Sequence, residues 1–137
     1  MSTMYPEFAA GRDARLLASP LERLARVDPG LWRLDACGVT PATRAIPALV
    51  HRDAYDATTK RFRVLVLGGM SGSASAVELA FRVLESFADS AQPWDRIALT
   101  AIPCANPDGL ALGTSPENAA HGNPTAGYPP GDTFFNH

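Results

Sequence analysis

The sequence predicts an α/β domain with a mixed, partly parallel sheet in a three-layer αβα arrangement. Three observations lead to this prediction. Two short apolar runs, 63–67 and 97–102, each end in a turn, rich in glycine after the first and in proline and asparagine after the second. A helical pattern from about 73 to 89 lies between them, and a helix and two strand candidates precede them. A strand, a helix and a second strand in this order are typical of a βαβ unit, whose strands are parallel.

The first predicted helix begins at Ser19-Pro20-Leu21-Glu22. A serine at the N-cap, a proline at the first helical position and a glutamate three residues after the cap together form a capping box. Asp28-Pro29-Gly30 ends the helix. Its apolar residues recur at helical spacing on one face: Leu21, Leu24, Ala25 and Val27.

Two strand candidates, 31–36 and 44–50, follow this helix and surround a turn, so we expect them to form a hairpin. Pro47 has no N–H to donate and therefore predicts that the second strand lies at a sheet edge or is irregular. The polar segment His51 to Lys60 is expected to be a solvated loop.

The run 63–67 ends in Gly68-Gly69, and the helix that follows has an apolar stripe. The second run ends in a turn over Pro103 to Gly109. Residues 113–137 show no helical or strand period and are expected to be a loop. Because so long a loop at the end of a compact domain is unusual, we interpret 1–137 as a single, incomplete α/β domain. The apolar stripe of the helix comprises Val77, Ala80, Phe81, Leu84 and Phe87.

The composition narrows the function classes. Hydrophobic residues make up 46% of the chain and charged residues 19%, a balance that indicates a folded domain and not a disordered chain. The net charge of -2, without a Lys/Arg cluster, argues against nucleic acid as a partner. No apolar stretch is long enough to span a bilayer and no secretory signal opens the chain, so we expect a cytoplasmic protein without membrane contact. Cys37 and Cys104 form no metal motif and are expected to be reduced, packed thiols.

Ligands of parallel α/β sheets bind at the carboxyl ends of the strands, which directs attention to the turns after Leu67 and Ile102. Asn106-Pro107-Asp108-Gly109, directly after a strand, resembles the Asn-Pro-Asp-Gly turn of the zinc carboxypeptidases. Upstream, Cys37-Gly38-Val39 and Arg44-Ala45-Ile46-Pro47 are similar to the Gly-Lys-Ser and Gly-Arg-x-Ile segments of that family's hairpin.

The order of elements over residues 15–112 resembles the front half of the zinc carboxypeptidase domain. The resemblance implies that family's phosphorylase/hydrolase-like fold and a metallopeptidase ancestry, with hydrolysis of C-terminal peptide or amide bonds. The family binds zinc through a His-x-x-Glu pair after the first buried strand. Ser71 and Ala74 occupy those two positions here, and neither is a zinc ligand. We therefore expect this chain to bind no zinc or other cofactor and to have no carboxypeptidase activity.

The remaining positions support the same expectation. His51, His121 and His137 lack partners at i+3 or i+4 and are interpreted as solvated surface histidines. The family grips the substrate carboxylate with an Asn-Arg pair, and the nearest match, Thr125 to Pro129, has Ala126 in place of the arginine.

Two other functions fit the same residues. Gly69-Met70-Ser71-Gly72-Ser73 is close to the nucleophile elbow of serine hydrolases, with Asp108 and either His121 or His137 completing a triad. Alternatively, the domain is a non-catalytic module that binds a peptide or a small carboxylate. The candidate pocket residues for this second function are Ser71, Ser73, Asn106 and Asp108.

Each of these candidates also has a purely structural interpretation. The glycines permit a tight turn, and Ser71 or Ser73 caps the following helix. Asp108 fixes the backbone of its own turn, and Arg44 pairs with a carboxylate near the sheet edge. The aromatic residues of the last segment, Tyr128, Phe134 and Phe135, either pack over the sheet or belong to an interface.

Overall fold

The fold was analysed in a computed structural model, which describes residues 18–88, 95–113 and 117–123. No helix among these residues is both long enough and apolar enough to cross a membrane. The elements in chain order are α1 (Ala18–Val27), β1 (Trp32–Val39), β2 (Ala45–His51), β3 (Phe62–Leu67), α2 (Ala74–Ala88), β4 (Ile97–Ile102) and α3 (Pro107–Ala111).

The four strands form one mixed sheet in the order β1-β2-β4-β3. β3 and β4 run parallel and pair along their full lengths, from Phe62 with Ile97 to Leu67 with Ile102. β1 and β2 form the predicted antiparallel hairpin. β2 also runs antiparallel to β4, joined at Leu49 and Val50. The predictions of a βαβ unit and of a mixed, partly parallel sheet are confirmed.

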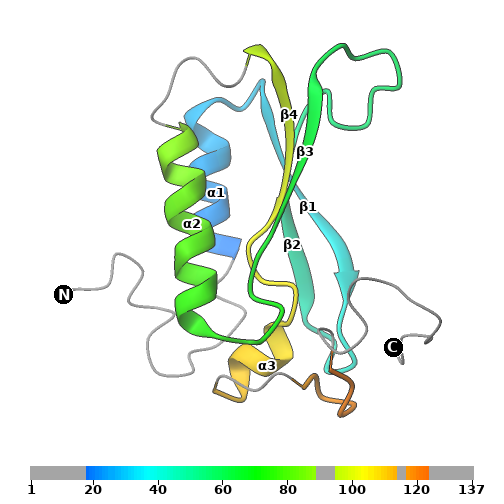
Figure 1. Ribbon diagram of the computed structural model, residues 1–137, viewed down its shortest axis with the longest axis vertical. Coiled ribbons are helices and arrows are strands. Elements are labelled where there is room, and N and C mark those ends of the chain that lie inside the picture. The colour runs from blue at the N-terminus through cyan, green and yellow to red at the C-terminus, as the bar shows by residue number, and fades with distance from the viewer. Residues whose placement is uncertain (1–17, 89–94, 114–116, 124–137) are drawn as a thin grey trace.

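Helices α1 and α2 lie side by side against one face of this sheet (Figure 1). The core between the helices and the sheet is apolar. Residues of a β-strand alternate between the two faces of the sheet, so every second side chain points toward the helices and contributes to this core. The described residues therefore supply the sheet and one of the two helical layers that the sequence predicts. The buried residues of this core are Leu21, Trp32, Leu49, Val77, Phe81, Leu84, Leu99, Ala101, Cys104 and Leu110.

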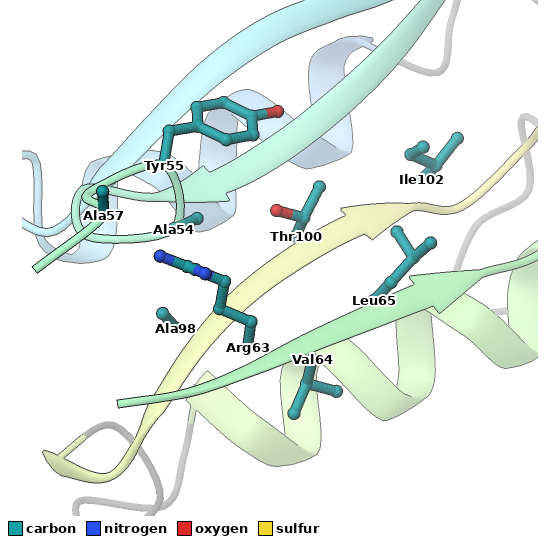
Figure 2. A pocket seen from close by; sticks show the side chains of 9 residues that line it. All are labelled: Ala54, Tyr55, Ala57, Arg63, Val64, Leu65, Ala98, Thr100 and Ile102. Atoms are coloured by element: carbon teal, nitrogen blue, oxygen red, sulfur yellow. The ribbon is translucent and has the colours of Figure 1, made fainter. Parts of the chain in front are cut away.

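The opposite face of the sheet is partly open to solvent. Leu65 is 61% exposed on β3, and Leu67 is 38% exposed. A hollow of about 640 Å³ lies on this face, and its lining includes Tyr55, Leu65, Thr100 and Ile102 (Figure 2). Parallel strands are normally covered on both faces, so this exposure is unusual for β3.

Two details of α1 and β2 differ from prediction. α1 includes both Ala18 and Ser19, so Ser19 is not the cap, and Val27 is 67% exposed instead of packed.

β2 is an inner strand despite Pro47. Its ladder with β4 involves only Leu49 and Val50, so Pro47 lies beyond that pairing and breaks no bond with β4. The irregularity expected of Pro47 appears on the other side, where the register with β1 shifts next to it.

Candidate functional site

The turns that follow β3 and β4 lie against each other, as expected for the carboxyl ends of neighbouring parallel strands. The Ala105 N–H donates to the Gly68 carbonyl at 2.9 Å, and the Asn106 N–H donates to the Gly69 carbonyl at 3.2 Å. The Asn106 side chain adds a third link, donating from Nδ2 to the Met70 carbonyl at 3.3 Å. The candidate residues of both turns are thereby brought to one edge of the sheet.

Close packing explains the glycines at the start of the first turn. A Cβ on Gly68 would lie 2.8 Å from both the Ala80 Cβ and the Pro103 carbonyl oxygen. Gly69 has φ +62, and a Cβ there would lie 2.7 Å from a Val77 methyl group. Both distances are shorter than van der Waals contact, so the turn can approach α2 and the β4 loop only because these residues lack side chains.

Asn106 begins a helix where the sequence predicted only a turn. Its Oδ1 accepts the Gly109 N–H at 2.9 Å, which caps the short helix α3, and Pro107 occupies the first helical position. This combination of an asparagine cap and a proline at the first position is a helix start signal. The side chain is 1% exposed, and its amide is directed to backbone carbonyls of Met70 and Glu117. Asn106 therefore has a structural role at this edge.

Asp108 is fully buried and accepts four hydrogen bonds. Its donors are the Thr40 hydroxyl at 2.7 Å, the Arg44 guanidinium at 3.0 Å, the Ala119 N–H at 3.0 Å and the Ala42 N–H at 3.4 Å. These bonds tie α3 to the β1–β2 turn and to the segment 117–123. Arg44 thus has the carboxylate partner that the sequence predicted, and Asp108 holds backbone segments together.

The charge state of Asp108 follows from this environment. Burial by itself would raise the pKa of the carboxyl group, because it disfavours the charged form. The hydrogen bonds from Thr40, Ala119, Arg44 and Ala42 stabilise that charge and outweigh burial, so the pKa of Asp108 lies below its ordinary value. A carboxylate this firmly held in its charged form is poorly suited to accept a proton in catalysis.

The two serines of the first turn differ in their surroundings. Ser71 is exposed, and within the described part of the chain it makes no hydrogen bond to a histidine. Ser73 directly precedes α2, where its carbonyl accepts the Val77 N–H at 3.1 Å and its hydroxyl lies 2.9 Å from the Ser75 hydroxyl. Ser73 therefore occupies the capping position of α2, whereas Ser71 faces solvent.

The interpretation of His51 as a solvated loop residue is wrong. His51 is the last residue of β2, is 0% exposed and packs edge-on against Trp32 with 5.5 Å between ring centroids. Its Nδ1 accepts the Asp53 N–H at 3.1 Å, and its Nε2 has no hydrogen-bond partner. Burial lowers the pKa of His51, with the nearby Asp53 opposing the shift. Alternation along β2 could have revealed this, because His51 shares a sheet face with Leu49.

The other two histidines do not complete a site within the described residues. The His121 side chain is 88% exposed, as expected for a surface histidine, but its Nδ1 lies 3.2 Å from the carboxylate of Glu117, four residues earlier, where no partner was expected. His137 and the segment Thr125 to Pro129 lie outside the described residues, as do Tyr128, Phe134 and Phe135.

The donor set at this edge does not fit zinc. Among the described residues, no three His, Cys, Asp or Glu side chains lie close enough together to hold a metal ion. Asp108 is saturated by its four donors, and Ser71 and Ala74 are not zinc ligands. Cys104 is 0% exposed, and burial raises the pKa of its thiol to about 12, which disfavours the thiolate form through which cysteine binds metals.

The fold as far as it extends is that of metallo-carboxypeptidases. A metallo-carboxypeptidase from Burkholderia cenocepacia matches 77% of this chain with a TM-score of 0.64 and 20% identity. Bovine thrombin-activatable fibrinolysis inhibitor, whose structure was solved in complex with tick carboxypeptidase inhibitor, matches 74% with a TM-score of 0.58 and 12% identity. The aligned part covers 30% and 33% of those chains, so this chain spans about a third of their length. No protein-family model matches the chain, and no curated protein matches it.

Proposed function

We propose that this chain is a carboxypeptidase-fold protein of metallopeptidase ancestry that does not itself hydrolyse peptides. One observation carries this proposal: Ser71, in the turn before α2, and Ala74, the first residue of α2, occupy the positions of the His-x-x-Glu pair of the zinc carboxypeptidases. A serine hydroxyl is not among the usual zinc ligands, and alanine has no donor atom. The mechanism of those enzymes needs a metal that polarises the carbonyl and activates water, and this turn offers no ligand for one.

The neighbouring polar residues support the same conclusion, because none is available to replace the missing pair. Asn106 is engaged in capping α3 and in bonding the Met70 carbonyl. Asp108 is engaged with Thr40 and Arg44. Moving either side chain to a metal would leave buried donors without partners, which costs free energy for each one.

Metal analysis tests this proposal directly. The purified chain is incubated with zinc, freed of excess metal and measured by elemental mass spectrometry. We expect far less than one zinc per chain and no release of a C-terminal residue from a blocked dipeptide. One zinc per chain, or hydrolysis that tracks with the purified chain, would refute the proposal.

A matched pair of variants makes the test specific to the turn. Ser71→His with Ala74→Glu restores both family ligands, whereas Ser71→His with Ala74→Gln restores only the imidazole. Competition with a chromogenic chelator should show tighter zinc binding by the first variant than by the second. Equal binding by the two would mean that this turn does not occupy the position of the family's metal site.

A non-catalytic module that binds a peptide C-terminus or a small carboxylate is a second candidate. The exposed hydroxyl of Ser71 favours it, because this residue lies just before α2, where the positive end of the helix macrodipole attracts anions. Titration with hippurate, followed by NMR shifts of the residue 69–75 amides, tests it. Binding that Ser71→Ala weakens would support the candidate, and an absence of shifts at millimolar hippurate would refute it.

A further inference from the structure

The two ring nitrogens of the buried His51 have different surroundings. Nδ1 accepts the Asp53 N–H at 3.1 Å, whereas Nε2 has no hydrogen-bond partner among the residues that the structure describes. The ring is 0% exposed and packs edge-on against Trp32, its neighbour across the end of the β1–β2 hairpin. An imidazole nitrogen that accepts a hydrogen bond carries no proton, so the proton of the neutral ring is on Nε2.

This arrangement is incompatible with the charged form of the ring. Both nitrogens of an imidazolium carry protons, so Nδ1 could no longer accept the Asp53 N–H, and two donors would face each other. The new charge would also be buried, which is unfavourable without a partner. Burial accordingly lowers the pKa of His51, Arg61 and Arg52 lower it further, and Asp53 opposes the shift. The ring can therefore gain a proton only if the ring or the Asp53 backbone moves.

Asp53 lies near the start of the loop 52–61, which connects β2 to β3, and it links the two ends of that loop. Its carboxylate accepts the Arg61 Nε at 3.0 Å, from the residue just before β3. The next residue, Ala54, donates its N–H to the His51 carbonyl at 2.9 Å and is 6% exposed in a second apolar cluster. The bond between His51 and Asp53 thus belongs to the set of contacts that hold the loop against the end of β2.

Within the described part of the chain, the Asp53 carboxylate is the acidic group that acts on the His51 ring, whereas Arg61 and Arg52 oppose a positive charge there. The neighbouring elements β1, β4 and α1 direct no buried charge at the ring. β4 contains no charged residue, and the charged residues of the other two are all exposed. They are Arg33 and Asp35 on β1, and Glu22, Arg23 and Arg26 on α1. A protonated ring would therefore turn toward Asp53.

We propose that His51 is a pH-sensitive switch for the loop 52–61. Protonation of Nδ1 breaks the hydrogen bond from the Asp53 N–H, and the imidazolium then pairs with the Asp53 carboxylate in competition with Arg61. The start of the loop moves away from the end of β2, and Trp32 loses its edge-on contact. The proton comes from solvent and returns to it, so the change is reversible. The switch uses no residue of the β3–α2 turn and stands independently of the proposed function.

NMR of the isotope-labelled chain between pH 8 and pH 5 tests the proposal. At pH 8 the ring nitrogen shifts of His51 should show the proton on Nε2. As His51 titrates, the Asp53 amide should lose protection from hydrogen exchange by about tenfold, once the intrinsic pH dependence of exchange is removed, because one hydrogen bond is lost. The amide of Thr100, which lies between β2 and β3 in the sheet, should keep its protection.

Three variants make the test specific to the ring. His51→Asn keeps an acceptor but cannot titrate, so the Asp53 amide should stay protected throughout the pH range. His51→Phe has no acceptor, so the same amide should be poorly protected at every pH. His121→Asn is the matched control, because the His121 side chain is 88% exposed and the switch should respond to pH as in wild type.

Several results would overturn the proposal. A proton on Nδ1 at pH 8 would do so, as would protection of the Asp53 amide that stays constant while His51 titrates. A pH dependence that persists in His51→Asn would show that another group is responsible. If Thr100 lost its protection together with Asp53, the chain would be unfolding as a whole, and a local switch would be excluded.

Discussion

The guanidinium group of Arg44 and the carboxylate of Asp108 form a 3.0 Å ion pair between residues 64 positions apart. Arg44 comes from the turn of the β1–β2 hairpin, and Asp108 comes from α3. The Asp108 side chain is 0% exposed, whereas the Arg44 side chain is 31% exposed. The pair therefore joins the hairpin to the loop edge of the sheet, with its negative partner removed from water.

Asp108→Asn should destabilise the fold, because it removes the charge that four donors surround. We expect a loss of about 3 kcal/mol in the free energy of unfolding, as for other buried ion pairs that lose one partner. Urea denaturation followed by circular dichroism measures it. Asp35→Asn is the control: Asp35 pairs with Arg33 at the surface and should change stability by less than about 1 kcal/mol. Equal effects of the two variants would contradict this account of Asp108.

The same carboxylate should make stability depend on pH in the acid range. The pKa of Asp108 is lower in the folded chain than in the unfolded chain, so the unfolded state binds more protons as the solution is acidified. Its stabilising contribution is complete above the ordinary carboxyl pKa of about 4 and is lost as the pH falls through the folded value. Between pH 2 and 6, the free energy of unfolding should therefore change more steeply with pH for wild type than for Asp108→Asn. Parallel pH profiles would show that Asp108 is not the group responsible.

His51 should add a second pH dependence, nearer neutrality. The pKa of His51 is lowered in the folded chain. Between that lowered pKa and the ordinary histidine pKa of 6.5, the imidazole is therefore mainly protonated only in the unfolded state. Stability should consequently fall as the pH is lowered below 6.5, and it should be fully restored above it. His51→Asn keeps an acceptor for the Asp53 N–H but cannot titrate, and its stability should be level through this range. A variant that retains the wild-type slope would refute the assignment to His51.

Two glycines with similar backbone conformations should respond very differently to alanine. Gly69 and Gly113 both have positive φ, at +62 and +84. A Cβ on Gly113 would meet nothing within 4 Å, so only the backbone strain of about 1 kcal/mol should appear. A Cβ on Gly69 would lie 2.7 Å from Val77 and 2.9 Å from the Cys104 Cα, which should add about 2 kcal/mol more. Thermal unfolding of the two variants compares these costs, and equal shifts would contradict the packing argument.

The sequence predicted the parts of the fold that depend on local pattern. The two parallel strands were evident as short apolar runs that end in turns, and the helix between them was evident from its apolar stripe at helical spacing. β4 has the predicted bounds, Ile97–Ile102, and α2 runs from Ala74 to Ala88 instead of from about 73 to 89. The resemblance of the loop edge to metallo-carboxypeptidases also predicted the fold that the structural comparisons show.

What the sequence did not predict depends on contacts between distant residues. His51 is buried because it packs against Trp32, which lies opposite it on β1. The polar residues that follow His51 in the sequence indicated a solvated loop instead. α3 was interpreted as a turn because Asn, Asp and Gly favour turns locally. Its helical form is supported by the Asn106 cap and by the donors that hold Asp108, which come from segments far along the chain. The roles of the candidate pocket residues in ligand binding stay predictions.

Because Cys104 is buried, its reaction with a thiol reagent reports when this part of the chain opens. Cys37 is exposed, whereas Cys104 is sealed beside the Gly69 turn. A thiol-specific alkylating reagent should therefore modify Cys37 in the native chain and modify Cys104 only in molecules whose two turns have separated. The rate at which a second adduct appears in the mass spectrum therefore measures how often the turns after β3 and β4 separate, without any engineered label.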